Sequence, residues 1–342
     1  MATISAHEVR YDPYDVEINA DPYPVFRRLR DEAPLYYNEQ HDFYAVSRYD
    51  DVEAGLVDAA TYISSRGAIL ELIKANLPLP AGTLIFEDPP LHSIHRSLLS
   101  RVFTPKKMAA LEPTVRAFCA RCLDPLVGTG RFDFVADLGA QMPMRTIGLL
   151  LGIPEQDQAS IRDHVDATLR TEAGRPMSSS VDIALSGELF ADYIDWRAEH
   201  PAEWEKLRTR PELLPDAVEE ILRWVSPISH FTRTATGDYE LRGRTIHTGD
   251  QVALYFASAN RDEDVFDDPF GFSVDRRPNP HLAFGFGEHF CMGAHLARLE
   301  ITTIFGHLLR RLSSFEVSGS VERLSSIING SIKRLPLRYR TR

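Results

Sequence analysis

The hydrophobic pattern of the chain begins with a short amphipathic helix and a hairpin. Asp21 at the N-cap and Pro22 at the first helical position predict that a helix starts here. Two short alternating runs, 35–37 and 43–46, flank a polar stretch and predict a β-hairpin. Residues 62–90 are rich in proline and glycine around an apolar centre, so we expect an irregular surface loop there.

Helical periodicity dominates the middle of the chain. Apolar positions at helical spacing run from about 91 to 200, with breaks predicted at 128–130 and 152–154, where glycine and proline gather. Residues 228–246 instead carry β-branched residues and turn signals, and the segment 325–338 also has the character of a strand. The pattern therefore predicts a mainly α fold with small β-sheets.

The composition of the chain indicates the number of domains and the cellular compartment. The chain has 342 residues, of which 44% are hydrophobic, and no linker or repeat divides it, so we expect one domain over 1–342. The net charge of −11 argues against nucleic acid as a partner. Residues 1–15 are polar and no apolar run reaches the length of a membrane span. We expect a cytoplasmic monomer with no membrane anchor.

The chain has three cysteines, which are too few for a disulfide framework. Cys119 and Cys122 lie in an apolar helical run, and no second Cys/His pair completes a zinc site, so buried structural cysteines are favoured over a metal centre. Cys291 is different, because it lies in a loop rich in glycine that precedes a helical pattern. Glycines permit tight turns and close approach to a flat cofactor, and the helix start would stabilise an anionic sulfur.

The loop around Cys291 has the pattern Phe-Gly-x-Gly-x-His-x-Cys-x-Gly over residues 284–293. Six such positions fill together by chance far less often than ~one in a million windows. The pattern resembles the haem-thiolate signature of the cytochrome P450 family, and the resemblance extends along nearly the whole chain. It implies a haem b cofactor (iron protoporphyrin IX) whose iron Cys291 ligates.

Further residues match positions at which the family holds the haem propionates. His92 and Arg96 share one helix face in an Asp-Pro-Pro-x-His-x-x-x-Arg stretch, and their spacing alone favours a solvated basic face. Arg233 and His289 match two further propionate donors. The resemblance thus implies the following cofactor-binding residues: His92, Arg96, Arg233, Phe284, Gly285, His289, Cys291 and Gly293.

Glu220 and Arg223 form a Glu-x-x-Arg pair on a predicted helix. Spacing alone predicts an exposed pair that contributes a few tenths of a kcal/mol. The resemblance instead implies a buried structural network that braces the cysteine loop. The family's third member is an arginine in a Pro-x-Arg-Phe element, but this chain has Gly271 there, which leaves Arg276 or Arg277 as candidates.

One part of the family pattern is absent from the sequence. Members carry a long helix over the haem with an Ala/Gly-Gly-x-Asp/Glu-Thr motif, whose acid and alcohol deliver protons to bound O₂. Residues 100–225 contain no such motif. The nearest candidates are Asp166 with Thr168, and Thr171 with Glu172. We therefore assign no catalytic residue on this side of the haem.

The position of the missing segment can be inferred from its neighbours. The sequence 189–197 is typical of the end of a lid helix, and 204–220 is typical of the stretch entering the Glu-x-x-Arg helix. In the family the distal helix lies between them. We expect an internal deletion near 197–203, and hence a P450-type fold that lacks its long central distal helix.

The resemblance implies a monooxygenase that inserts one oxygen atom from O₂ into an apolar organic substrate. Electrons would come from NAD(P)H through a ferredoxin and its reductase. A basic patch of Arg101, Lys106, Lys107 and Arg298 is a candidate ferredoxin surface, although it is equally an ordinary solvated face. The alternative function is a haem-binding protein whose oxygenase activity is impaired or absent because the distal helix is missing.

Overall fold

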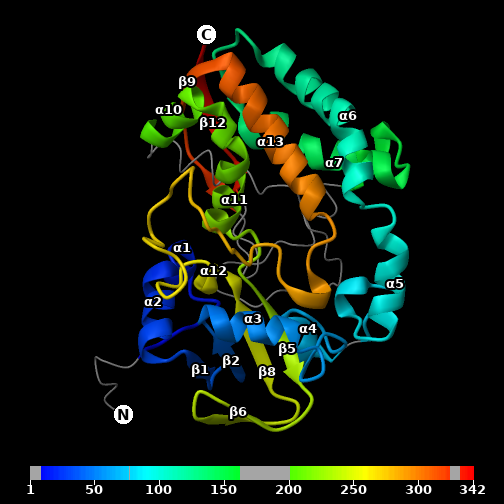
Figure 1. Cartoon of the computed structure of the whole chain (residues 1–342), viewed down its shortest axis with the longest axis vertical. Helices are drawn as coiled ribbons and strands as arrows, with labels where there is room; N and C mark the ends of the chain where they lie inside the picture. Colours follow the sequence, from blue (N-terminus) through cyan, green and yellow to red (C-terminus); the bar gives the residue numbers. More distant parts are fainter. Residues whose placement is uncertain (1–8, 77, 162–200, 324–331) are drawn as a thin grey trace.

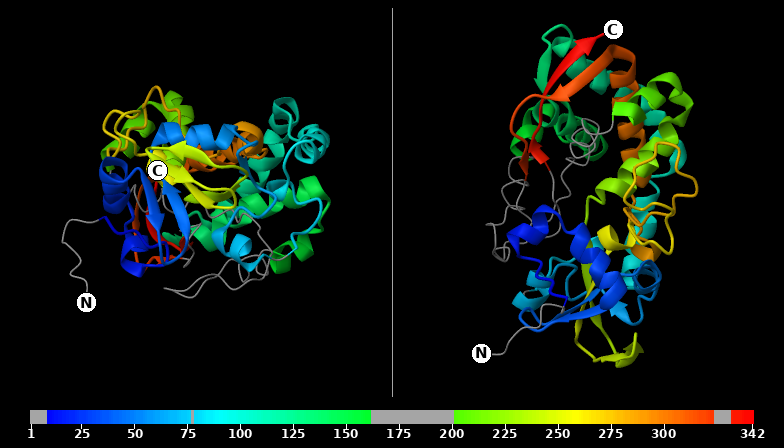
Figure 2. Two further views of the ribbon diagram at one scale, coloured as in Figure 1. Left: turned by 90° about the horizontal axis from the view of Figure 1, so that it is seen from below. Right: turned by 90° about the vertical axis from the view of Figure 1, so that its left-hand side faces the viewer.

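The computed structural model describes residues 9–76, 78–161, 201–323 and 332–342. Figure 1 shows a sheet built from β1, β2, β8 and β5 at one end of the long axis, with the C-terminus and a group of long helices towards the other. The second view of Figure 2 shows the same division from the side. The molecule therefore joins a β-rich part to a helical part, in agreement with the predicted mainly α fold.

Within the described ranges, the helices and strands have the following bounds. The α-helices are α1 Val16–Ala20, α2 Tyr23–Glu32, α3 Tyr49–Val57, α4 Leu70–Ala75, α5 Leu91–Ser100, α6 Pro105–Leu123, α7 Gln141–Leu151, α10 Pro201–Thr209, α11 Leu214–Val225, α12 Phe256–Ala259 and α13 Ala294–Arg311. The strands are β1 Leu35–Asn38, β2 Phe43–Val46, β3 Tyr62–Ile63, β4 Arg131–Asp133, β5 His230–Ala235, β6 Tyr239–Leu241, β7 Arg244–Ile246, β8 Gln251–Tyr255, β9 Leu312–Val317, β10 Glu322–Arg323, β11 Ile332–Arg334 and β12 Pro336–Thr341.

The predicted hairpin is confirmed, and it forms the edge of the largest sheet. β1 and β2 pair antiparallel, with Tyr37 opposite Tyr44. β2 then pairs parallel with β8, and the strand order is β1-β2-β8-β5-β3. The predicted strands within 228–246 are confirmed as β5, β6 and β7. This sheet matters for the site because β5 carries Arg233.

Two local predictions need correction. The first main helix, α2, begins at Tyr23 with Pro22 at the N-cap, and Asp21 lies outside it and forms no cap. The stretch 62–90 is not wholly irregular, because its apolar centre forms the short helix α4. Ile69 and Leu72 are buried with Phe86 in a small hydrophobic cluster, so burial orders this segment despite its many turn residues.

The largest hydrophobic core lies in the helical part, among α6, α10, α11 and α13 and the strands β4, β9 and β12. In α11 the buried residues Leu214, Val218, Ile221 and Leu222 recur at helical spacing and face this core. Pro215 in the first turn fixes the helix start. Because α11 packs beside α13, it brings the Glu-x-x-Arg sequence close to the helix that follows Cys291.

The predicted breaks of the helical region are confirmed. The glycines at 128–130 lie in a turn that β4 follows, and Gly152 ends α7 with φ +70°. The longest helices within the described ranges are α6, with 19 residues, and α13, with 18. None of the helices in these ranges is both long enough and apolar enough to cross a membrane.

Several predictions fall on residues that the structure does not describe. The acid–alcohol candidates Asp166 with Thr168 and Thr171 with Glu172 lie outside the described ranges, as do the lid-helix end at 189–197 and the first part of the 197–203 junction. The described chain resumes at Pro201, where α10 starts.

Candidate haem site

The cysteine loop is a compact turn that leads into α13. The Cys291 amide donates to the carbonyl of Phe284 at 2.9 Å, which closes the loop on itself. The carbonyl of Cys291 accepts from Ala294 at 3.3 Å, so the sulfur-bearing residue is tied to the first turn of the helix. The loop is therefore held by its own backbone and by the start of α13.

Two of the three glycines in this loop are required by its backbone. Gly285 and Gly287 have φ of +67° and +66°, which side chains other than glycine rarely adopt. A Cβ at Gly287 would also lie 2.5 Å from the carbonyl oxygen of Leu56 on α3. Gly293 has an ordinary φ of −79°, and a Cβ there would lie 3.8 Å from the Cys291 sulfur. The protein itself therefore does not demand glycine at Gly293.

The environment of the Cys291 sulfur combines burial with partial stabilisation of an anion. Burial raises the pKa of the Cys291 thiol, because it disfavours the thiolate. Hydrogen bonds from the backbone N–H groups of Gly293 and Ala294, and the positive charges of Arg96 and Arg298, oppose this increase in pKa. The sulfur thus has the donors and cations that a metal-ligating thiolate needs.

The structure brings together the four basic side chains predicted to hold the propionates. The rings of His92 and His289 lie 4.2 Å apart, and His289 Nε2 lies 3.2 Å from the Ser64 hydroxyl. The charges of Arg233 and Arg96 both act on His289. Arg96 also donates to the carbonyl of Phe290 in the cysteine loop. Side chains from α5, β5 and the loop therefore converge beside Cys291.

Burial disfavours a positive charge on all four of these side chains. Burial, together with the charges of Arg233, His92 and Arg96, lowers the pKa of His289 to about 3. Burial also lowers the pKa of Arg233 to about 10, and the nearby Asp88 carboxylate offsets only part of this effect. The pKa values of His92 and Arg96 are likewise lowered, first by burial.

His92 provides the most direct test of whether an anionic group fits here. Its side chain is 1% exposed, and neither ring nitrogen has a hydrogen-bond partner in the part of the chain that the structure describes. A buried polar group without a partner is costly, so its partner is expected to be a ligand. Two carboxylates on one cofactor edge match this cluster, and a haem fits the residues present.

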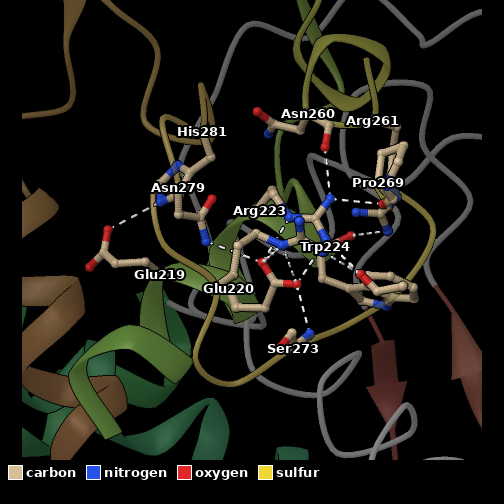
Figure 3. Close-up of polar contacts among 12 residues, drawn as sticks. Glu219, Glu220, Arg223, Trp224, Asn260, Arg261, Pro269, Ser273, Asn279 and His281 are labelled. Carbon is tan, nitrogen blue, oxygen red and sulfur yellow. Dashed lines mark hydrogen bonds and ion pairs between the residues drawn. The ribbon is translucent and has the colours of Figure 1, made fainter. Parts of the chain in front are cut away.

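Glu220 and Arg223 form a buried ion pair, not an exposed one. Both side chains are 0% exposed, and the guanidinium binds the carboxylate through two hydrogen bonds of 2.8 Å. Arg223 also donates to the carbonyls of Asn260 and Pro269 (Figure 3). It donates to the carbonyl of Gly271 as well. The pair therefore fastens α11 to the segment that leads towards the cysteine loop.

Arg276 is the third member of this network. Its Nε lies 3.0 Å from each carboxylate oxygen of Glu220, and its guanidinium also donates to the carbonyl of Gly271. Arg277 points outward instead and pairs with Asp216, with its side chain 74% exposed. Position 271 has a glycine and no arginine, but Arg276, five residues further on, supplies the second arginine that binds the Glu220 carboxylate.

A second cluster near the loop was not predicted from the sequence. Glu219 accepts two hydrogen bonds from Arg298, both 2.7 Å, and its carboxylate lies 3.1 Å from His281 Nε2. Arg298, predicted to belong to an exposed basic patch, keeps its side chain 32% exposed, but this ion pair partly offsets its positive charge. Arg101, Lys106 and Lys107 are exposed as expected. No local pattern marks Glu219, since its partners come from distant parts of the sequence.

Cys119 and Cys122 belong to the helical core. Cys119 is fully buried on α6, and Cys122 is partly buried beside it. Burial raises the pKa of the Cys119 thiol to about 12 and also raises that of Cys122. No group of three potential metal ligands occurs among the described residues. Both sulfurs have the environment of structural cysteines.

Glu300, further along α13, should make the free energy of unfolding depend on pH. Burial raises the pKa of its carboxyl from 4.5 to about 7, although a hydrogen bond with Thr146 opposes this shift, and Oε1 has no partner among the described residues. Between these pH values the unfolded chain has lost a proton that the folded chain keeps, so the free energy of unfolding falls as pH rises from about 4.5 to about 7. Above about pH 7 both states have lost the Glu300 proton, so this decrease in the free energy of unfolding stays constant.

Glu300→Gln should remove this decrease. Relative to the parent, we expect it to gain on the order of 3 kcal/mol in unfolding free energy between about pH 5 and about pH 8. Urea unfolding of both proteins across this range measures the difference. Glu316→Gln is the matched control, because Glu316 is exposed on β9. A parent and a Glu300→Gln variant with parallel pH profiles would contradict the prediction.

Comparisons with known proteins agree with this site. The family model described as Cytochrome P450 matches residues 198–339. The chain is 33% identical to cytochrome P450 123 of Mycobacterium tuberculosis, with 98% of each chain covered. It is 29% identical to CYP199A2 of Rhodopseudomonas palustris, over 95% of this chain and 93% of that one.

Solved structures of cytochromes P450 have the same fold as this chain. The crystal structure of CYP109E1 from Bacillus megaterium in complex with testosterone superposes with a TM-score of 0.85 at 26% identity, covering 94% of this chain and 98% of that one. CYP109B1 from Bacillus subtilis gives a TM-score of 0.80 at 28% identity, over 96% and 100% of the two chains. The chain therefore belongs to the cytochrome P450 family of haem-thiolate monooxygenases, and its cofactor is haem.

Proposed function

We propose that Cys291 ligates the haem iron and that His92, Arg96, Arg233 and His289 hold the propionates. The observation that carries this proposal is the convergence of these basic groups beside the cysteine loop, around the buried His92, whose ring nitrogens have no hydrogen-bond partner among the described residues. Charge-assisted hydrogen bonds to carboxylates would satisfy these donors and relieve the cost of burying them.

The loop residues have distinct roles in this proposal. The N–H groups of Gly293 and Ala294 stabilise the Cys291 thiolate. The Phe284 carbonyl fixes the Cys291 backbone, and the turn at Gly285 lets the loop lie close to a flat ligand. When bound, haem supplies the iron at which O₂ is activated. The Glu220–Arg223–Arg276 network keeps the loop in position.

The substrate in this proposal is an apolar organic molecule, and the electrons come from NAD(P)H through a ferredoxin and its reductase. Structures similar to this chain support the substrate class: CYP109E1 was solved with testosterone, and P450BioI with a hexadec-9Z-enoic acid ligated acyl carrier protein. The exposed cations Arg101, Lys106 and Lys107 follow α5, which contacts the cysteine loop through Arg96. They suit an acidic redox partner.

A second candidate function is a haem protein with impaired oxygenase activity. The alignment with cytochrome P450 123 spans 394 positions, more than the 342 residues of this chain, so some aligned positions have no residue here. The family-model match begins at residue 198, close to the expected junction at 197–203. Loss of a helix of ~30 residues, ~45 Å long, would remove one wall of the haem pocket together with the acid–alcohol relay.

One experiment separates these two functions. The chain is reconstituted with haem, and the ferrous–CO spectrum reports whether a thiolate ligates the iron. Consumption of NAD(P)H, product and peroxide are then measured with a ferredoxin, its reductase and a panel of steroids and fatty acids. Product formed in step with NAD(P)H supports the coupled monooxygenase. NAD(P)H consumed mainly to peroxide supports the impaired form. A spectrum with no thiolate signature would overturn the proposed ligation.

A further inference from the structure

Glu219 lies on α11 next to Glu220 but belongs to a separate set of contacts. Figure 3 shows its carboxylate directed towards His281, away from the Glu220–Arg223 pair. Arg298 on α13 binds both of its oxygens at 2.7 Å. Burial raises the pKa of the Glu219 carboxyl, but hydrogen bonds from Arg298 and His281 outweigh burial and lower the pKa to about 2. The carboxylate is therefore ionised across the physiological range.

Arg298 connects this cluster to the cysteine. Its guanidinium carbon lies 4.7 Å from the centre of the Phe284 ring, and the Phe284 carbonyl accepts the Cys291 amide. The charge of Arg298 is also one of those that favour an anionic Cys291 sulfur. The Arg298 and Glu219 side chains are 32% and 30% exposed, so solvent screens this pair only in part. Glu219 thus partly cancels a positive charge that acts on the sulfur.

His281 connects the same carboxylate to the start of the loop. Its side chain is 4% exposed, and its Nδ1 accepts the Ala283 amide at 3.3 Å, so Nε2 carries the proton and donates to Glu219. The neighbouring Leu282 amide donates to the Asn260 side chain at 2.7 Å. The entry of the loop is therefore fixed by side chains from outside the loop.

We propose that Glu219, Arg298 and His281 form a clamp that positions the Cys291 loop and sets the electric field at its sulfur. Arg298 supplies the positive charge, and Glu219 both holds it in place and limits its effect. This inference rests on the haem ligation proposed above. The three are positioning residues, since they act on the iron through Phe284 and Cys291.

Substitutions of Arg298 and Glu219 should shift the reduction potential of the haem iron in opposite directions. Arg298→Gln removes a positive charge near the thiolate and should shift the reduction potential of the iron to a more negative value. Glu219→Gln keeps an amide oxygen for Arg298 but removes the opposing charge, so it should shift the potential to a more positive value. Each shift should be about tenfold in the reduction equilibrium, or 59 mV for one electron. The double variant should return close to the parent.

Potentiometric titration of the haem-loaded proteins, with the ferrous–CO spectrum as a check on ligation, tests this prediction. Asp216→Asn is the matched control, because Asp216 lies on the same helix and makes a similar pair with the exposed Arg277. Arg298→Lys keeps the positive charge, so its reduction potential should lie closer to that of the parent than to that of Arg298→Gln. Shifts of the same sign in the two single variants, or none beyond the control, would overturn the inference.

A second measurement keeps the clamp testable without haem. Hydrogen exchange of the loop amides in the haem-free chain, followed by mass spectrometry of peptides covering 281–292, should be faster in Glu219→Gln than in the parent, and unchanged in Asp216→Asn. Unchanged exchange in Glu219→Gln would overturn the positioning role. A parent that shows no thiolate spectrum but a looser loop in Glu219→Gln would contradict the ligation and leave the positioning supported.

Discussion

Cys291→Ser should abolish the thiolate signature of the ferrous–CO spectrum and reduce oxygenase turnover to background. A serine hydroxyl is far less acidic than a thiol, so it does not supply the anionic, electron-donating ligand that a haem-thiolate centre needs. The backbone donors from Gly293 and Ala294 would remain, but they would face a neutral oxygen. Spectra of the reconstituted parent and variant, recorded at equal haem concentration, measure the effect.

The fold should survive this substitution, because the loop is closed by backbone groups and not by the sulfur. Circular dichroism and the unfolding midpoint of Cys291→Ser should therefore stay close to those of the parent. Cys119→Ala is the control: it removes a fully buried sulfur from α6, and should lower stability while leaving the spectrum intact. A thiolate spectrum that persists in Cys291→Ser would show that another residue ligates the iron.

The parts of the site that could be predicted from sequence are those coded by neighbouring residues. The loop around Cys291 is a contiguous pattern. Its glycines at 285 and 287 have positive φ values, which the local turn requires. His92 and Arg96 share a helix face because their spacing sets it. Such features follow from backbone geometry, which short stretches of sequence determine.

The parts that could not be predicted depend on which distant side chains meet. Arg276 and Arg277 are adjacent in sequence, yet one is 10% exposed beside Glu220 and the other is 74% exposed on the surface. Only the packing of their segment against α11 decides between them. The ion pair of Arg298 with Glu219 could not be predicted either, because the two residues lie on different helices. The helix α4 was missed since its six residues owe their order to burial.

Glu220→Gln should strongly destabilise the protein through the structural network of Glu220, Arg223 and Arg276. The change keeps the size of the side chain but leaves Arg223, which is 0% exposed, and Arg276 without their shared negative charge. Removing one partner of a buried ion pair costs about 3–5 kcal/mol, because the remaining charge stays buried and uncompensated. The amides of Ser273 and Asn279 also donate to this carboxylate and would lose a charged acceptor. The whole segment that leads to the cysteine loop is therefore expected to loosen.

Guanidinium unfolding and the haem content of the purified protein measure both consequences. We expect Glu220→Gln to lose stability in the range above and to bind less haem than the parent. The Asp216→Asn control lies on the same helix, but its arginine partner is exposed, so its cost should stay within about 1 kcal/mol. Equal stability of the two variants would mean that the buried position of Glu220 adds nothing to the bracing of the loop, and that Arg223 and Arg276 are held by the backbone carbonyls alone.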